Sequence, residues 1–199
     1  MAANDTGKEQ AVSTDNDDMK PAEQAGVTAL PGDGAATGRW VLDPAGSRAE
    51  FHVKHFWGAI TVHGSFGQIT GEGIVGADGT ITGRLVMDAE SLSTRNKQRD
   101  KHLRSADFFD TERHLEVVLT VTGGKPAGPR ALACQGTLKA AGHVEPVEFT
   151  AHVEEVSENA VTLRAELVVD RTKFGMTWSP LHVTAAMARG TVVARFVRP

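Results

Sequence analysis

Apolar and polar residues alternate along most of the chain from Arg39 onward. Successive side chains of a β-strand point to opposite faces, so this period of two predicts antiparallel strands with one buried and one solvated face. Two runs, Val144–Val156 and Val161–Arg171, exceed the length of about 5–6 residues that is typical of strands and favour the tilted wall of a barrel over a sandwich. Further alternating segments are residues 51–56, 81–88 and 115–122.

Turn signals and one helical segment divide this pattern. Residues 94–105 form the only segment with a helical pattern, with Ser93 or Thr94 as a candidate N-cap. Many short strands separated by regular turns predict an all-β barrel with one short helix. The turn signals are Asp78-Gly79, Gly123-Gly124, residues 126–129, Gly142 and Glu158-Asn159.

Residues 1–38 differ from the rest of the chain in composition. They contain seven acidic residues, two lysines and no aromatic residue, whereas the whole chain of 199 residues has a formal net charge of −4. A segment with so little apolar area cannot offset the entropy of ordering its backbone, so we expect a disordered acidic tail. Residues 39–199 are nearly neutral in net charge and are long enough to form one domain with its own core.

Targeting signals and membrane spans have no clear candidate in the sequence. The first 30 residues are acidic and lack the basic start and apolar run of a secretory signal, so we expect a cytoplasmic protein. A signal removed from a precursor is compatible with the same sequence. No apolar stretch reaches the length of a membrane span. Cys134 is the only cysteine, so an intrachain disulfide is impossible.

Catalytic, metal-binding and nucleic-acid-binding patterns are weak. His52 and His55 lie three apart on a strand and face opposite sides, and a pairing of His55 with His63 across a hairpin supplies only two metal ligands. Cys134 has no recognisable catalytic partner, and no nucleophile elbow or phosphate loop is present. The near-neutral domain contains no Tyr and no basic-aromatic stripe, which argues against nucleic acid. We therefore expect no catalytic residue, no metal and no nucleic-acid partner.

A basic cluster occupies the predicted helix. One interpretation is a phosphate site, because arginine side chains hold phosphate groups well. The other is a solvated face, or arginines that pair with the neighbouring Asp100, Asp107 and Asp110 and attach the helix to the barrel; the proximity of these carboxylates favours this structural role. The cluster consists of Arg95, Lys97, Arg99, Lys101 and Arg104.

A series of short motifs resembles the YceI-like family of lipocalin-like barrels, which bind polyisoprenoids and related lipids. The resemblance covers residues 39–199, and the order and spacing of the motifs make it specific. Gly46 stands where the family usually has His, and Leu115 replaces a family Pro. The matching motifs are Trp40, Asp43-Pro44 and Ser47; Phe51, Val53 and His55; Gly64 and Phe66; Arg99-Asp100 and 102–105; Asp107-Phe108-Phe109-Asp110; Gly136-Thr137-Leu138; Pro146-Val147; and Phe174-Gly175-Met176.

The resemblance implies an eight-stranded antiparallel barrel with an apolar tunnel, often assembled as a homodimer. The expected ligand is a polyprenyl phosphate, an isoprenoid quinone or a fatty-acid derivative, with no other cofactor and no catalysis. An enzyme that acts on an isoprenoid or haem-like ligand, and a stress or partner-interaction module, are the alternatives. The candidate lining residues, which alternation alone would place equally well in a filled core, are Phe51, Val53, His55, Ile81, Leu85, Met87, Phe174, Met176 and Trp178, and the head-group candidates are Arg99, His102 and Arg104.

Overall fold

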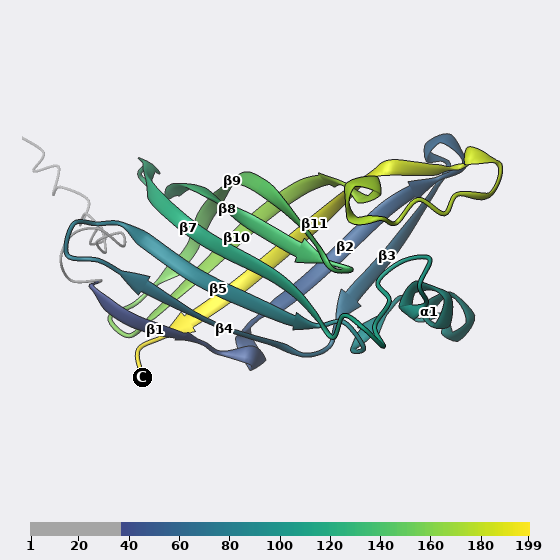
Figure 1. Cartoon of the computed structure of the whole chain (residues 1–199). Helices are drawn as coiled ribbons and strands as arrows, with labels where there is room; N and C mark the ends of the chain where they lie inside the picture. The colour runs from purple at the N-terminus through teal and green to yellow at the C-terminus, as the bar shows by residue number, and fades with distance from the viewer. Residues whose placement is uncertain (1–36) are drawn as a thin grey trace, which may run out of the picture.

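The structure is a computed structural model and describes residues 37–199. The expected disordered tail lies almost entirely outside the described residues. The described chain forms one sheet of 11 strands and one α-helix (Figure 1). The strands are β1 (Gly38–Leu42), β2 (Arg48–His55), β3 (Ile60–Phe66), β4 (Ile69–Val75), β5 (Ile81–Asp88), β6 (Leu92–Ser93), β7 (Glu116–Gly128), β8 (Ala131–Ala140), β9 (His143–Val156), β10 (Ala160–Asp170) and β11 (Thr184–Val197); the helix is α1 (Lys97–Arg104).

Eight of the strands close into a ring in the order β1-β4-β5-β7-β8-β9-β10-β11. The ring is closed by two residue pairs between the first and last strands, Val41 with Val197 and Leu42 with Phe196. All pairings are antiparallel, which confirms the predicted eight-stranded antiparallel barrel. Closure gives every strand of the ring a hydrogen-bonded neighbour on both sides.

The remaining strands make the two ends of the barrel different. Strand β11 pairs with β1 only at its C-terminal end, and from Val193 back to Thr184 it pairs with β2 instead. The β2–β3 hairpin continues the wall beyond the ring, and the end of β3 pairs with β6. Figure 1 shows this hairpin and α1 at the same end, which we call the α1 end, opposite the C-terminus.

Alternation places the apolar side chains of the ring in its interior. Leu85 and Met87 of β5, Leu119 of β7 and Leu167 of β10 belong to one buried cluster. A second cluster near the opposite end of the barrel, the β1 end, contains Trp40 and three valines, Val75, Val153 and Val161. Burial of each such side chain stabilises the fold by about 1.5–3 kcal/mol, so the inward faces supply most of the stability.

The Gly123-Gly124 pair does not form the predicted turn. Strand β7 runs through it to Gly128, and the register with β8 shifts between Val121 and Gly123, as in a β-bulge. A Cβ atom on Gly124 would lie 3.1 Å from Cβ of Ile81 on the neighbouring strand, so close packing rather than reversal of the chain accounts for this glycine. The prediction was wrong because bulges and turns favour the same residue.

The helix is shorter than predicted and has a different cap. It begins at Lys97, and the side chain of Asn96 accepts a hydrogen bond of 3.0 Å from the Arg99 amide. Thr94 lies before the helix and donates to the buried carboxylate of Asp100 from its amide (2.7 Å) and its hydroxyl (2.5 Å). Arg104 donates to the carbonyls of Glu90 and Leu92, so the end of α1 is attached to the β5–β6 region.

No helix within residues 37–199 is long and apolar enough to cross a membrane.

We predict that Asp100→Ala destabilises the protein by about 1.5–3 kcal/mol, because two donors of Thr94 lose a charged acceptor. Burial alone would raise the pKa of Asp100, but the hydrogen bonds from Thr94 and the charge of Arg104 outweigh it, and the pKa is lowered. The carboxylate therefore stabilises the fold fully above its unfolded pKa and loses this effect as the pH falls through the lower folded pKa. Urea unfolding at several pH values measures both effects.

Glu112→Ala is the control, because this exposed side chain should change stability by less than about 0.5 kcal/mol. Equal unfolding midpoints for the Asp100 and Glu112 variants would show that the buried carboxylate does not anchor α1.

Candidate functional site

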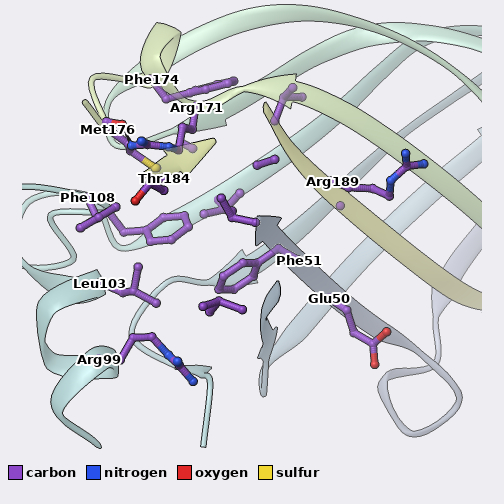
Figure 2. A pocket seen from close by; sticks show the side chains of 18 of the residues that line it. Glu50, Phe51, Arg99, Leu103, Phe108, Arg171, Phe174, Met176, Thr184 and Arg189 are labelled. Carbon is purple, nitrogen blue, oxygen red and sulfur yellow. Dashed lines mark hydrogen bonds between the residues drawn. The ribbon is translucent and has the colours of Figure 1, made fainter. Parts of the chain in front are cut away.

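A cavity of ≈ 720 Å³ opens at the α1 end of the barrel. Ligand pockets commonly have volumes of about 300–1,000 Å³. Figure 2 shows the walls: Phe51 projects from β2, Phe174 and Met176 lie above it, and Leu103 and Phe108 approach from the side of α1. The cavity is therefore enclosed by the barrel, the helix and the loop before β11.

Three aromatic rings form one wall of the cavity. The ring of Phe51 lies 5.5 Å from that of Phe66 and 6.0 Å from that of Phe109, and the latter two are 5.9 Å apart. Gly64 makes room for this cluster, because a Cβ atom there would overlap the ring of Phe51. The segment after α1 is thus attached to the β2–β3 hairpin by aromatic contacts, and the cluster closes the gap between them.

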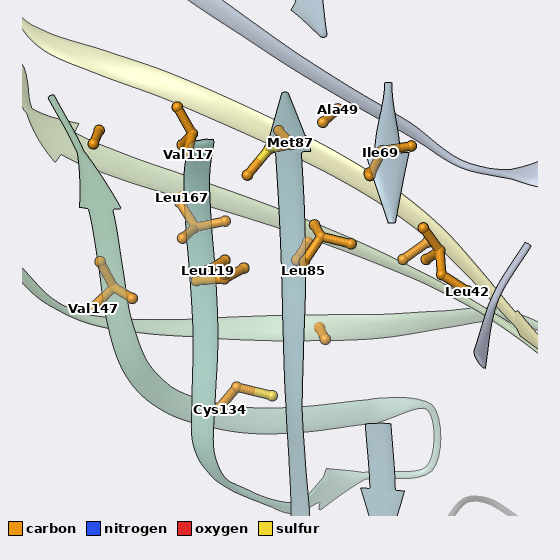
Figure 3. Close-up of a cluster of buried hydrophobic side chains, with 14 of the residues drawn as sticks. Leu42, Ala49, Ile69, Leu85, Met87, Val117, Leu119, Cys134, Val147 and Leu167 are labelled. Carbon is orange, nitrogen blue, oxygen red and sulfur yellow. The ribbon is translucent and has the colours of Figure 1, made fainter. Parts of the chain in front are cut away.

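Leu119 and Val192 form the floor of the cavity. Both also line a smaller apolar space of ≈ 120 Å³ beneath, toward the β1 end, together with Leu85 and Cys134. Figure 3 shows Leu85, Leu119 and Cys134 among the buried side chains of the barrel interior. Burial raises the pKa of the Cys134 thiol, so the thiol stays protonated and apolar in this layer. The floor is apolar throughout.

Polar side chains gather at the mouth of the cavity instead. Arg99 donates from Nε to the hydroxyl of Thr94 (2.7 Å) and from a terminal nitrogen to its carbonyl (3.0 Å). His102 contacts Asp107 through Nε2 at 3.1 Å and packs edge-on against Trp178, with 4.4 Å between ring centroids. These contacts fix the orientation of two basic groups beside the opening.

Arg171 is a buried cation in the cavity wall, only 6% exposed. Its hydrogen bonds within the described residues all go to carbonyl oxygens, those of Ala185 (2.9 Å), Met176 and Trp178 (3.2 Å). Burial lowers the pKa of Arg171, and nearby Asp170 acts in the opposite direction. The side chain holds the loop before β11 together and leaves a positive charge beside an apolar cavity.

His55 completes the basic lining of the mouth. Its Nδ1 atom lies 3.2 Å from the hydroxyl of Thr184. Burial lowers the pKa of His55, and the positive charges of Arg171 and Arg99 lower it further. The mouth thus brings together basic side chains from β2, α1 and the turn after β10, and their positive charges repel one another. This arrangement suits an anionic or oxygen-rich group.

Most of the predicted lining residues meet at this cavity. Phe51, Val53, His55, Met87, Phe174, Met176 and Trp178 line it. Ile81 and Leu85 line the smaller space instead, because inward positions at the start of β5 belong to the β1 end. Of the head-group candidates, Arg99 and His102 line the cavity. Arg104 does not, and its guanidinium group donates hydrogen bonds to the carbonyl oxygens of Glu90 and Leu92. The ligand-binding role of these residues stays a prediction.

The histidine pairing in the β2–β3 hairpin differs from the expected one. His63 pairs with His52, with ring centroids 5.4 Å apart, and His55 lies opposite Ile60. The turn between the strands, Phe56–Gly58 followed by Ala59, sets this register. Within the described residues, no three His, Cys, Asp or Glu side chains come together as a metal site would require.

Sequence analysis missed Arg171 as a site residue, although a signal was present. The inward positions of β10 are Val161, Leu163, Ala165, Leu167 and Val169, and continuing this alternation by one step reaches Arg171. An arginine at an inward position that directly follows an apolar face marks the place where the barrel interior becomes polar. Leu138 of β8 also lines the cavity and was not among the candidate lining residues.

Comparison with known proteins agrees with this architecture. Residues 40–196 match the family model of the YceI-like domain. The chain belongs to the YceI-like family. A UPF0312 protein of Shewanella baltica is 29% identical over 131 residues, which cover 64% of this chain and 68% of that protein.

Two solved structures share the fold of this YceI-like chain. BcnA of Burkholderia cenocepacia superposes with a TM-score of 0.71 at 17% identity and covers 77% of this chain and 98% of its own. A polyisoprenoid binding domain from Saccharophagus degradans superposes with a TM-score of 0.66 at 16% identity, covering 80% and 98% respectively. At these identities the likeness concerns the fold.

We predict that Gly64→Ala displaces the ring of Phe51 and reduces the space available in the cavity. The added methyl group overlaps the ring, so the ring must rotate toward the interior or the hairpin must separate. Binding of a fluorescent fatty acid should weaken by about tenfold, which corresponds to about 1.4 kcal/mol of overpacking. Fluorescence titration measures this change.

Gly67→Ala, at the end of the same hairpin, is the control, because its Cβ atom would lie 3.4 Å from the nearest atom, the carbonyl oxygen of Ser91. Equal affinity of the two variants would mean that the position of Phe51 does not limit the cavity.

Proposed function

We propose that this YceI-like protein binds one long-chain isoprenoid or related lipid and stores or carries it without chemical change. A polyprenyl phosphate, an isoprenoid quinone and a fatty-acid derivative are the ligand classes that fit. The observation that carries the proposal is the ≈ 720 Å³ cavity with an apolar floor and a basic mouth. The name of the structural neighbour from Saccharophagus degradans, a polyisoprenoid binding domain, supports the same class of ligand.

The apolar interior supplies the affinity in this proposal. Each methylene group that leaves water contributes about 0.8 kcal/mol, so a chain of several prenyl units approaches the practical limit of noncovalent affinity. Strong binding of the chain by itself does not select one lipid. The shape of the cavity and the position of its floor then determine which chain lengths fit.

The mouth orients the ligand. Arg99, Arg171 and His55 line the cavity from three different elements, and an anionic head group placed between them would interact favourably with all three. A guanidinium group that already binds carbonyl oxygens is held in a fixed position, which reduces the entropy lost on binding. The apolar chain would therefore enter first and the head group would stay near α1.

The distribution of polar groups favours a carrier over the two alternatives. An enzyme acting on the chain needs polar groups that converge deep in the barrel, whereas Leu119, Val192 and their neighbours make the floor apolar. A module that acts only through a protein partner does not need an open interior. The open cavity and the apolar floor are the features that support binding and storage.

We predict that Phe51→Glu and Met176→Glu each abolish lipid retention and leave β-structure in place. A carboxylate that projects into the cavity is unfavourable beside an acyl or prenyl chain, because the chain removes water from the charge. Native mass spectrometry of the purified protein, followed by organic extraction, identifies the bound species, and circular dichroism checks the fold.

Val168→Glu is the matched control, because Val168 is 53% exposed on the outer face of β10 and its variant should retain lipid. A protein that stays ligand-free after incubation with prenyl phosphates, quinones and fatty acids would overturn the proposed function.

We also predict that an anionic ligand binds more tightly as the pH falls. The pKa of His55 is lowered in the free protein, and a bound anion would raise it, so protons are taken up on binding between these two values. Affinity for a polyprenyl phosphate, relative to that of His55→Gln, should rise about three- to tenfold between pH about 7.5 and about 5.5. An unchanged ratio would show that the head group does not contact His55.

A further inference from the structure

Two loops at the α1 end form an exposed apolar projection. The β2–β3 turn supplies Phe56 (50% exposed), Trp57 (86%) and Ile60 (52%), and the loop before β11 supplies Leu181 (87%). We call these four residues the apolar tip. The loops are joined by a hydrogen bond of 2.7 Å from the Phe56 amide to the Val183 carbonyl, so the two loops lie side by side.

The backbone of the apolar tip is unfavourable for the residues that occupy it. Phe56, Trp57 and Leu181 all have left-handed conformations, with φ of 49°, 54° and 54°. Glycine or asparagine usually occupies such positions, because a bulky side chain is strained there. Strain and exposure of large apolar groups together suggest that the tip has a function in contact with an apolar environment.

The apolar tip adjoins the opening of the cavity. Phe56 belongs both to the tip and to the cavity lining, and Pro180, which precedes Leu181, also lines the cavity. Asn96 and Gln98 line the cavity from the N-terminal end of α1 and are exposed. Figure 1 shows the two loops and α1 at the same end of the barrel. A ligand that enters here passes between the tip and the helix.

The helical side of the opening carries positive charge. Arg95, Lys97 and Lys101 are exposed, and no ion pair within residues 37–199 involves them. Two acidic residues beside the helix are engaged, because Asp100 binds Thr94 and Asp107 contacts His102, whereas Glu50, which lines the cavity from β2, and Glu112 are exposed. One side of the opening is therefore formed by apolar side chains, and the other by a helix whose exposed outer face carries unpaired cations.

We propose that the α1 end docks on the surface of a lipid bilayer that contains anionic head groups. The apolar tip inserts at the boundary of head groups and acyl chains, where Trp side chains are favoured, and α1 lies against the anionic head groups. The opening of the cavity then faces the bilayer, and a lipid moves between bilayer and barrel without crossing water. This inference rests on the proposed function, which supplies the reason for the cavity to face a membrane.

A bilayer fits this surface better than a second copy of the chain. In a symmetric pair, the basic side of the opening would face either an identical basic side, which repels it, or the apolar tip of the second copy, which removes its water without supplying a counter-charge. An anionic bilayer complements both halves of the surface, because it offers negative charge at its surface and apolar chains beneath. The opening of a lipid cavity between these halves adds an independent reason for the same partner.

Sedimentation of the full chain with vesicles tests the proposal. We expect binding to vesicles of phosphatidylcholine with phosphatidylglycerol and weaker binding to phosphatidylcholine alone. The double variant Trp57→Ser/Leu181→Ser should lose at least about tenfold in affinity for both vesicles. Lys97→Glu/Lys101→Glu should remove the preference for phosphatidylglycerol. Val144→Ser/Val168→Ser, which changes exposed side chains on the outer wall of the barrel, is the control and should bind like the unmodified chain.

Failure of this inference can be distinguished from failure of the proposed function. Lipid supplied from cyclodextrin tests retention without vesicles, and the apolar-tip variant should retain it. Vesicle binding that is unchanged in the apolar-tip variant, or absent in the unmodified chain, would overturn docking. A dimer that becomes a monomer in the apolar-tip variant, without vesicle binding by either, would assign the tip to a second copy and also overturn it.

Discussion

One edge of β11 pairs with two different strands, and the rest of the structure depends on this division. Near its C-terminal end β11 pairs with β1 and closes the ring, and over most of its length it pairs with β2. Where β1 ends, the edge of β11 would be exposed, and pairing with β2 satisfies its backbone groups there. The β2–β3 hairpin therefore extends the wall only at one end. The ring is filled with side chains where β1 closes it and open where β2 replaces β1.

The open end accounts for the position of α1 and of the polar groups. One side of the cavity is formed by α1 and the segment after it, which the ring contacts of Phe51, Phe66 and Phe109 hold against the hairpin. Charged side chains at this end can reach water, whereas the same charges deeper in the barrel would lose it. Arg171 is the residue at the border, since its charge is buried and its hydrogen bonds join Met176 and Trp178 of the loop at the rim to Ala185 of β11.

The sequence predicted the barrel and most of the lining residues, because inward alternation on a strand follows from backbone geometry alone. It did not separate Ile81 and Leu85, which line the smaller space, from the residues that line the cavity, because alternation identifies the face of a strand and gives no information about depth along a tilted strand. It also interpreted Gly123-Gly124 as a turn, since the difference between a bulge and a turn depends on the neighbouring strand. Arg104 was ambiguous for a similar reason: its partners, the carbonyls of Glu90 and Leu92, are brought near only by the fold.

The apolar floor has a consequence for how selectivity is divided within the molecule. Leu119 and Val192 separate the cavity from the smaller space toward the β1 end, and they belong to β7 and β11. The basic side chains at the mouth belong to other elements, mainly β2, α1 and the turn after β10. Under the proposed function, the depth of the barrel would limit the length of a bound chain, and the mouth would distinguish its head group. Separate parts of the sequence would set these two selectivities, so that one could change without the other.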